Sequence, residues 1–235
     1  MEIVLRDVRV EGRRSTLLEA AQLRLATGEC VLVAGEPGQG HTGLALVATG
    51  RLAPFQGEVT LVDDNGDPDP TPARLRAATA VVDLPGVTEP EDMLTVGTVV
   101  GESLALARRN ALPRAASRWL AEHRMADLEG TRVDALPGRI RTALLTALAV
   151  ERTSVRFLVL TLPDRHGGEP SGWWGVAQAF ASAGYGVLTQ CTRSSARDLG
   201  AGLPPAEGVA ARRAKPVEAL RVTPALDLPD AGAVR

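Results

Sequence analysis

A glycine-rich loop between a buried strand and a helix constrains the fold of this chain more than any other feature. The run ECVLVAG (29–35) is continuous and apolar, which is typical of a strand buried on both faces of a sheet. GEPGQGHTG (35–43) follows at once, and TGLALVATG (42–50) has the composition of a short apolar helix that ends at Gly50. A strand, a glycine-rich loop and a helix in this order form the context of a phosphate-binding loop.

The loop matches most of the phosphate-binding pattern G-x-x-x-x-G-K-[ST]. Gly35, Gly38 and Gly40 permit backbone angles that turn successive N–H groups toward an anion, and the helix adds the partial positive charge of its N-terminus. Thr42 stands where a hydroxyl coordinates magnesium, and His41 stands at the lysine position. The predicted nucleotide-binding residues are Gly35, Glu36, Pro37, Gly38, Gln39, Gly40, His41 and Thr42, and Thr42 is also the predicted metal ligand.

Histidine at position 41 weakens the expected phosphate binding. A lysine there reaches the β- and γ-phosphates as a fixed cation, whereas histidine is shorter and, with a pKa of ~6.5, is mostly neutral at pH 7. Losing a charge-assisted hydrogen bond of ~1.5–3 kcal/mol lowers affinity about tenfold to a hundredfold. Pro37 also contributes no N–H group. A glycine-rich turn without a ligand is the alternative interpretation of the loop.

The rest of the chain alternates between strand-rich and helix-rich regions. Strands are predicted at 2–10, 29–35, 57–64, 78–83, 155–163 and 185–191, and 15–26 is either extended or a short helix. Further helices are predicted at 95–109, 113–125, 138–152 and 171–184. This pattern indicates an α/β fold with a mixed sheet, an N-terminal antiparallel β region and an inserted helical subdomain at about 85–152.

Composition and charge limit the classes of function. The chain has 235 residues, with 26 basic and 28 acidic side chains, so it lacks the basic excess of a nucleic-acid or anionic-membrane binder. The only lysine is Lys215, and the two cysteines, Cys30 and Cys191, cannot form a disulfide framework. The first residues lack the apolar core of a signal peptide, and no apolar stretch approaches the ~20 residues that span a bilayer. A cytoplasmic location is therefore expected.

The order of these segments resembles the ATP-binding domain of ABC transporters over residues 1–200. In that family an antiparallel β region precedes the phosphate loop, and a glutamine loop, a helical subdomain, a signature sequence, a Walker B strand and a switch histidine follow. LAPFQGEVTLVDDNGDPD (52–69) is similar to the segment that follows the loop in the family. The resemblance implies a P-loop NTPase-like mixed sheet. Residues 201–235 form an Ala-, Pro- and Arg-rich tail, with one edge strand predicted at 217–224.

Positions that match the catalytic motifs of the family hold other residues. Asp83 stands at the glutamine, where a solvated loop carboxylate is expected. Thr161 and Leu162 stand at the magnesium-orienting aspartate and the catalytic glutamate, and Gln190 replaces the switch histidine. None of these three can act as a carboxylate base. Asp164 lies two residues beyond Leu162, and the period of two along a strand does not by itself place it at the γ-phosphate. No catalytic residue is therefore predicted.

The remaining motifs depart from the family as well. LPGRI (136–140) stands at the signature L-S-G-G-Q, where Pro137 removes a hydroxyl and an N–H group and Arg139 is expected at a solvated helix start. No aromatic residue lies near 11–12 to stack on adenine. His123 and His166 are expected on the surface, with His166 in the loop that faces the dimer partner in the family.

The resemblance implies a degenerate ATP-binding cassette protein that binds ATP and Mg weakly and hydrolyses little or no ATP alone. It would serve as a cytosolic subunit or regulator of an ABC-type membrane transporter, at the inner face of the membrane through an ABC-type permease. The resemblance also implies a homo- or heterodimer with another ABC ATPase. No nucleic-acid partner is expected. Two alternatives stay open, namely the non-hydrolysing half of an asymmetric heterodimer and a nucleotide-free interaction scaffold, which the altered LPGRI sequence favours.

Overall fold

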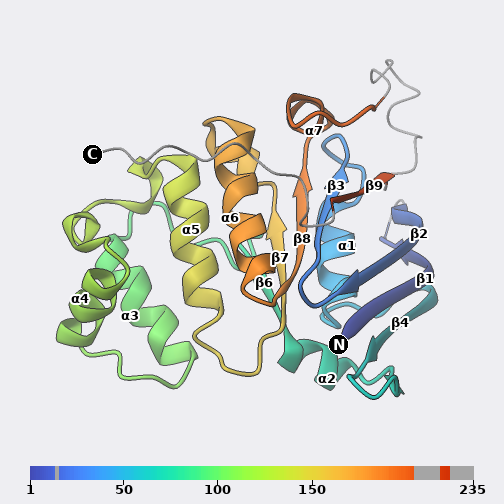
Figure 1. Ribbon diagram of the computed structural model, residues 1–235, viewed down its shortest axis with the longest axis horizontal. Helices are drawn as coiled ribbons and strands as arrows, with labels where there is room; N and C mark the ends of the chain where they lie inside the picture. Colours follow the sequence, from blue (N-terminus) through green and yellow to red (C-terminus); the bar gives the residue numbers. More distant parts are fainter. Residues whose placement is uncertain (14–15, 204–217, 223–235) are drawn as a thin grey trace.

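Two β-sheets lie on either side of a central helix in the computed structural model, which describes residues 1–13, 16–203 and 218–222 (Figure 1). The first sheet is antiparallel with the strand order β2-β1-β4-β5. Its strands are β1 (Glu2–Glu11), β2 (Thr16–Ala26), β4 (Gln56–Val62) and β5 (Pro68–Asp69). The predicted α/β fold with an N-terminal antiparallel region and a mixed sheet is confirmed.

The second sheet is mixed and has the strand order β6-β7-β8-β3-β9. Four of its strands run parallel, and the fifth, β9, pairs antiparallel with β3. The strands are β6 (Thr79–Val82), β7 (Phe157–Thr161), β8 (Gly186–Cys191), β3 (Cys30–Ala34) and β9 (Glu218–Val222). Every residue of β3, β6, β7 and β8 is buried, as expected for parallel strands that are covered on both faces.

Residues 16–26 form a strand, so the helical alternative for this segment was wrong. Leu18, Leu23 and Leu25 are buried while most of the residues between them are exposed. Alternation over 21–25, and a register shift between Leu18 and Ala21, place the leucines on one face of β2, which pairs with β1 along its length. The alanines of this segment favour a helix only weakly, and the tertiary pairing overrides them.

Helix α1 (His41–Ala48) fills the space between the two sheets. Leu44, Ala45 and Val47 of α1 pack in one core with the inward face of the first sheet and with alternate residues of the second sheet. Burying a leucine or valine side chain contributes roughly 1.5–3 kcal/mol, so this core fixes α1 and the loop before it against both sheets.

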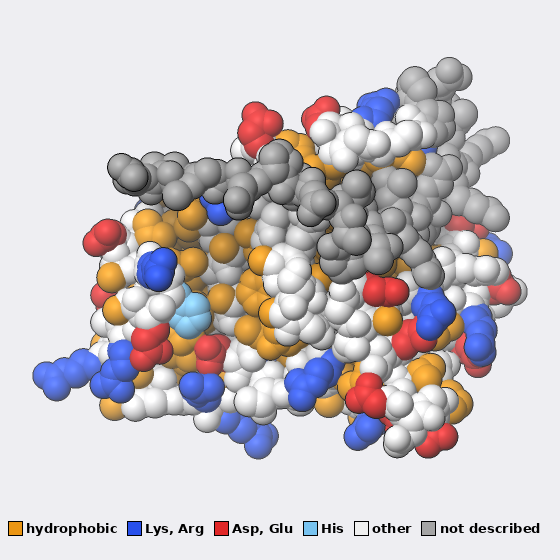
Figure 2. Space-filling model, in the orientation of Figure 1, with side chains coloured by type: hydrophobic (Ala, Val, Ile, Leu, Met, Phe, Trp, Pro, Cys, Tyr) orange, Lys and Arg blue, Asp and Glu red, His pale blue; other side chains and the backbone are white. Residues whose placement is uncertain are grey.

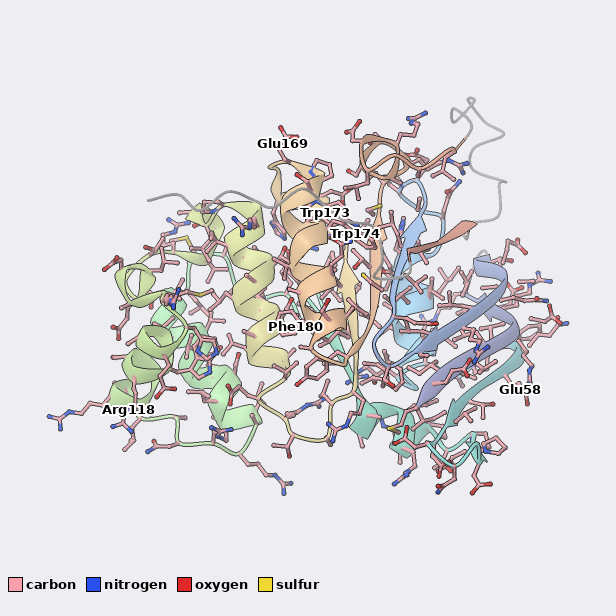
Figure 3. All side chains as sticks on the ribbon, in the orientation of Figure 1. Glu58, Arg118, Glu169, Trp173, Trp174 and Phe180 are labelled. Atoms are coloured by element: carbon pink, nitrogen blue, oxygen red, sulfur yellow. The ribbon has the colours of Figure 1, made fainter. Side chains whose placement is uncertain are left out.

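The other face of the second sheet is covered by helices. α5 (Gly138–Ala149) and α6 (Pro170–Ser182) lie against it, and α3 (Val96–Leu106) and α4 (Pro113–Glu122) form a helical lobe beyond them (Figure 1). Trp173 and Trp174 project from α6 into this second core, where they are 0% and 7% exposed (Figure 3). The short 3-10 helices η1 (Ala126–Leu128) and η2 (Val133–Ala135) join the lobe to α5.

Besides η1 and η2, three short helices in the described ranges were not predicted. They are α2 (Pro72–Ala78), η3 (Pro163–His166) and α7 (Arg193–Asp198). Each begins within one residue of a threonine, a proline or both, in sequence that is otherwise typical of turns. None of the helices in the described ranges is long and apolar enough to cross a bilayer. Acidic and basic side chains are interspersed around the rim of the face shown in Figure 2.

Candidate functional site

The glycine-rich loop runs from the end of β3 to the start of α1. Gly35 N–H donates to the carbonyl of Cys191 at 3.0 Å, so the loop begins against the end of β8. Gly38 and Gly40 have φ values of 87° and 99°, in the left-handed region that favours glycine. A Cβ atom on Gly40 would also lie 2.5 Å from the Leu17 carbonyl oxygen, so no other residue fits there without a shift of the backbone.

Several N–H groups of the loop have the arrangement of an anion site. The N–H groups of Gly38, Gly40, His41 and Thr42 donate no hydrogen bond to the residues that the structure describes. They lie at the N-terminal end of α1, where the helix dipole favours negative charge. The Thr42 side chain is exposed, and within the same residues its hydroxyl has no partner. The N–H groups are placed to bind a phosphate, and the Thr42 hydroxyl is placed to coordinate a metal ion.

Two side chains of the loop occupy its interior. The Gln39 side-chain oxygen accepts a hydrogen bond of 2.7 Å from Glu36 N–H, so that N–H group already has an acceptor. The His41 ring is only 7% exposed, and a Cβ atom on Gly35 would lie 3.1 Å from its Cε1 and Nε2 atoms. The ring therefore packs beneath the loop, whereas a lysine would extend across the loop to a phosphate.

Burial sets the protonation state of His41. It lowers the pKa of the imidazole, and the Cys191 carbonyl and the charges of Asp164 and Glu36 oppose this only in part. His41 Nε2 is buried and has no partner in the described part of the chain. His41 is thus neutral at neutral pH, and the loop lacks the fixed cation of the phosphate-binding pattern.

The end of β8 is tied to the first residue of α1. Gln190, at the predicted position of the switch histidine, is fully buried and donates from Nε2 to the His41 carbonyl oxygen at 2.9 Å. Its side-chain oxygen is buried and has no partner among the described residues. Gln190 therefore positions the helix start by a direct contact that the sequence did not reveal.

The end of β7 holds one carboxylate near the loop, that of Asp164, whose Oδ1 is buried without a partner among the described residues. The Thr161 hydroxyl donates to the Val82 carbonyl oxygen at 2.6 Å, and Leu162 has a left-handed φ of 47°. One oxygen of Asp164 accepts from Thr192 N–H at 2.8 Å and from the Ser195 hydroxyl at 2.8 Å. The Asp164 carboxylate thus caps the start of α7.

The expectation that Asp83 is a solvated loop carboxylate was wrong. Asp83 is 6% exposed and accepts two hydrogen bonds of 2.9 Å from the Arg141 guanidinium. Arg165 Nη2 lies 3.0 Å and His166 Nε2 lies 2.9 Å from its carboxylate oxygens. His166, expected on the surface, therefore points into the interior with a side chain that is 18% exposed.

The groups around Asp83 determine its charge state. Burial alone would raise the pKa of Asp83, but the contact with His166, the hydrogen bonds from Arg141 and the positive charges of Arg165 and Arg141 hold this pKa far below its usual range. Ligand atoms of Asp83, Glu89 and His166 lie within 4.8 Å of one another, a spacing that a metal ion accepts. Since Arg165 and Arg141 already supply positive charge there, the cluster is a buried ion network.

The start of α5 packs against the segment that follows β7. A Cβ atom on Gly138 would lie 2.4 Å from the Gly167 carbonyl oxygen, so the two backbones are in direct contact. Pro137 is the N-cap residue and has no side-chain cap, and Arg139 is exposed as predicted. α5 and α1 pack in different cores on opposite faces of the second sheet. LPGRI (136–140) and the loop at 35–42 thus belong to different faces of that sheet.

Comparison with known proteins identifies the fold. No protein-family model matches the chain, and no curated protein sequence matches it. A nucleotide-free ATP-binding cassette from an ABC transporter has a TM-score of 0.62 and 16% identity, with 82% of each chain covered. A bacterial ABC transporter cassette with a dimeric structure has a TM-score of 0.60 and 18% identity, with 83% of this chain and 90% of that one covered.

A third structure agrees with these two. It is cbiO1 from Clostridium perfringens, part of the ABC transporter complex cbiONQ, with a TM-score of 0.58, 16% identity and coverage of 81% of this chain and 77% of that one. The chain thus has the fold of the ATP-binding cassettes of ABC transporters, as the order of its segments predicted.

Proposed function

We propose that this protein is an ATP-binding cassette subunit or regulator of an ABC-type membrane transporter, with weak nucleotide binding and little or no ATP hydrolysis alone. The fold supports the cassette assignment, and the solved structures that share the fold come from ABC transporters. The protein would lie in the cytoplasm, against the inner face of the membrane through an ABC-type permease. A partner cassette, identical or different, would complete the dimer.

The N-terminal end of α1 supports weak phosphate binding. The free N–H groups of Gly38, Gly40, His41 and Thr42 would hold the phosphates of ATP, and the Thr42 hydroxyl would face Mg. When bound, ATP supplies a phosphoanhydride that water can attack. Within the described residues, the loop offers no lysine to that reaction.

One observation carries the proposal of weak binding, namely the buried His41 ring beneath Gly35. The ring replaces a charged side chain with a neutral one, and it is packed in the loop rather than extended from it. A phosphate there would gain backbone hydrogen bonds but no ion pair. The loss of about 1.5–3 kcal/mol reduces affinity about tenfold to a hundredfold relative to a lysine-containing loop.

The end of β7 supports the proposal of weak hydrolysis. A general base must lie within hydrogen-bond reach of the attacking water, and a carboxylate usually fills this role. Thr161 is bonded to Val82, Leu162 is apolar, and Asp164 is bonded to Thr192 and Ser195. Thr161 and Leu162 therefore offer no base to water, and Asp164 is held at the start of α7 through one of its two oxygens.

The proposal is tested by titrating the full-length protein with Mg-ATP in a calorimeter, with wild type and His41→Lys side by side. We expect the lysine variant to bind at least about tenfold more tightly, because it restores a charge-assisted hydrogen bond. His123→Lys is the matched control, since His123 is exposed at the end of α4 and stacks on Trp119. Equal affinities for wild type and His41→Lys would contradict the assigned role of His41.

The same titration separates the proposal from a nucleotide-free interaction scaffold. The interior position of Gln39 Oε1, bonded to Glu36 N–H, favours the scaffold, because it removes one donor from the loop. No binding of Mg-ATP to either wild type or His41→Lys would support the scaffold. Steady-state hydrolysis by wild type alone that Thr42→Ala abolishes would overturn the proposal of weak catalysis.

A further inference from the structure

Three arginines meet near the C-terminal end of α1 without an acidic partner. Arg51 Nη2 and Arg152 Nη2 both donate to the carbonyl oxygen of Thr79, at 3.2 and 2.7 Å. Arg76 Nη1 donates to the Gly50 carbonyl oxygen at 2.8 Å. Within the described ranges, none of the three arginines forms an ion pair.

Capping of the backbone accounts for only part of this cluster. Arginines are favourable at the C-terminal end of a helix, where the free carbonyl groups carry partial negative charge. Here, however, one carbonyl oxygen accepts from two guanidinium groups. Arg51 Nη1 also donates to the Thr49 carbonyl oxygen and the Thr79 hydroxyl, which leaves part of the five N–H donors of Arg51 and most of those of Arg152 unused within the described residues. Burial and the nearby charges of Arg152 and Arg76 also lower the pKa of Arg51. Positive charge and unused donors are therefore in excess at this point.

A cavity of about 210 Å³ opens beside Arg51 and Arg152. It runs along β6, the edge strand of the second sheet, and is lined by residues of that strand and of the helices α3 and α5. Asp83 also lines it, with its carboxylate paired to Arg141 and Arg165. Most of the remaining wall is apolar and includes Val82, Leu145 and Leu148. Two guanidinium groups at an otherwise largely apolar cavity match a ligand that has one anionic group and a short hydrocarbon body.

We propose that this cavity is a binding site for a small organic carboxylate. The carboxylate would accept hydrogen bonds from the unused donors of Arg51 and Arg152, in the bidentate geometry that guanidinium groups favour. The hydrocarbon part would lie against Leu145 and Leu148, and the ligand would contact the central sheet and the helical lobe together. The site is separate from the loop at 35–42 and does not depend on nucleotide binding.

The experiment is a calorimetric titration of the full-length protein with hexanoate at low ionic strength. We expect a dissociation constant of about 1 mM or tighter for wild type, and no binding of hexan-1-ol, which has the same hydrocarbon chain without the charge. Arg152→Gln should weaken hexanoate binding at least about tenfold. The Thr79 carbonyl keeps its bond to Arg51 in this variant, so the fold is preserved.

Arg156→Gln is the matched control. Arg156 lies four residues after Arg152 and does not line the cavity. Among the described residues, its side chain donates only to the Thr153 and Val155 carbonyl oxygens. The Arg156→Gln variant loses the same charge as Arg152→Gln, so hexanoate should bind to Arg156→Gln as to wild type, within about twofold. Ala149→Leu places extra bulk on the wall of the cavity and leaves the arginines unchanged. We expect this variant to lose hexanoate binding.

Several results would overturn the proposal. One is the absence of hexanoate binding to folded wild type, and another is equal binding by wild type and Arg152→Gln. Equal weakening in Arg156→Gln would show a general effect of net charge. Inorganic phosphate that binds as tightly as hexanoate, and that Arg152→Gln weakens to the same extent, would show an anion site in the cavity that does not use the apolar wall. That result would contradict the proposed ligand class.

Discussion

Arg141 forms a bidentate pair with Asp83 in the interior of the protein, with its Nε and Nη2 atoms each 2.9 Å from a carboxylate oxygen. The two side chains come from α5 and from the residue after β6, and Arg141 is only 1% exposed. Arg165 and His166, which follow β7, contact the same carboxylate. One buried anion therefore joins the helical region to two strand ends.

Arg141→Met is expected to lower the free energy of unfolding by about 3 kcal/mol, because breaking a buried ion pair leaves a charge without its main partner. Urea denaturation at pH 7 measures the change. Arg132→Met is the control, since Arg132 pairs with Asp134 and both side chains are more than a third exposed. That exposed pair should contribute less than about 1 kcal/mol. Equal losses of free energy of unfolding in the two variants would show that the buried pair contributes no more to stability than the exposed one.

The low pKa of Asp83 predicts an acid-sensitive contribution to stability. The folded-state pKa lies below the unfolded value of ~3.9, so the unfolded chain binds more protons as the pH falls. The stabilisation is complete above about pH 5 and is lost progressively below the unfolded pKa. Urea denaturation between about pH 5 and pH 3 should show a smaller loss for Asp83→Asn than for wild type. Parallel curves would contradict the assignment.

Gly138→Ala tests the contact between α5 and the segment after β7. The added Cβ atom would lie 2.4 Å from the Gly167 carbonyl oxygen, so one of the two backbones must move. We expect a loss of about 1–3 kcal/mol in the free energy of unfolding. Gly175→Ala in α6 is the control, because a Cβ atom there meets no atom within 4 Å. That variant should gain about 0.5–1 kcal/mol from helix propensity, and a similar gain in Gly138→Ala would refute the contact.

The fold could be predicted from sequence because its signals are local. Continuous apolar runs predicted the buried strands, and the glycine-rich loop predicted the step from β3 to α1. The helical alternative for 16–26 arose because alanine and leucine suit both states. This segment is a strand because it pairs with β1, a contact that local sequence does not reveal.

The candidate site was predictable in position but not in its contacts. The residues at 35–42 form a strand-to-helix loop as expected. The packing of His41 and Gln39 depends on rotamers, which the sequence does not determine. The pairing of Asp83 with Arg141 spans 58 positions. One signal existed, since Arg141 shares the helix face of Leu144, Leu145 and Leu148, where a charge needs a buried partner.

The buried imidazole of His41 predicts a second pH dependence, at higher pH than that of Asp83. Burial lowers the pKa of His41 below the unfolded value of ~6.5, so the unfolded chain binds the extra proton first. Stability is therefore retained above about pH 6.5 and lost as the pH falls below it. Urea denaturation at several values between about pH 7.5 and 5 should show a larger loss for wild type than for His41→Gln.

The comparison of these two proteins isolates His41, because His123 and His166 are present in both. The same physics predicts that mild acid does not restore phosphate affinity. A proton that enters the buried ring must overcome desolvation beneath the loop, so wild type should bind Mg-ATP no more tightly at about pH 6 than at pH 7.5. Calorimetric titration at both values measures this. A tenfold gain at the lower pH would mean that the ring leaves its buried position and acts as the missing cation.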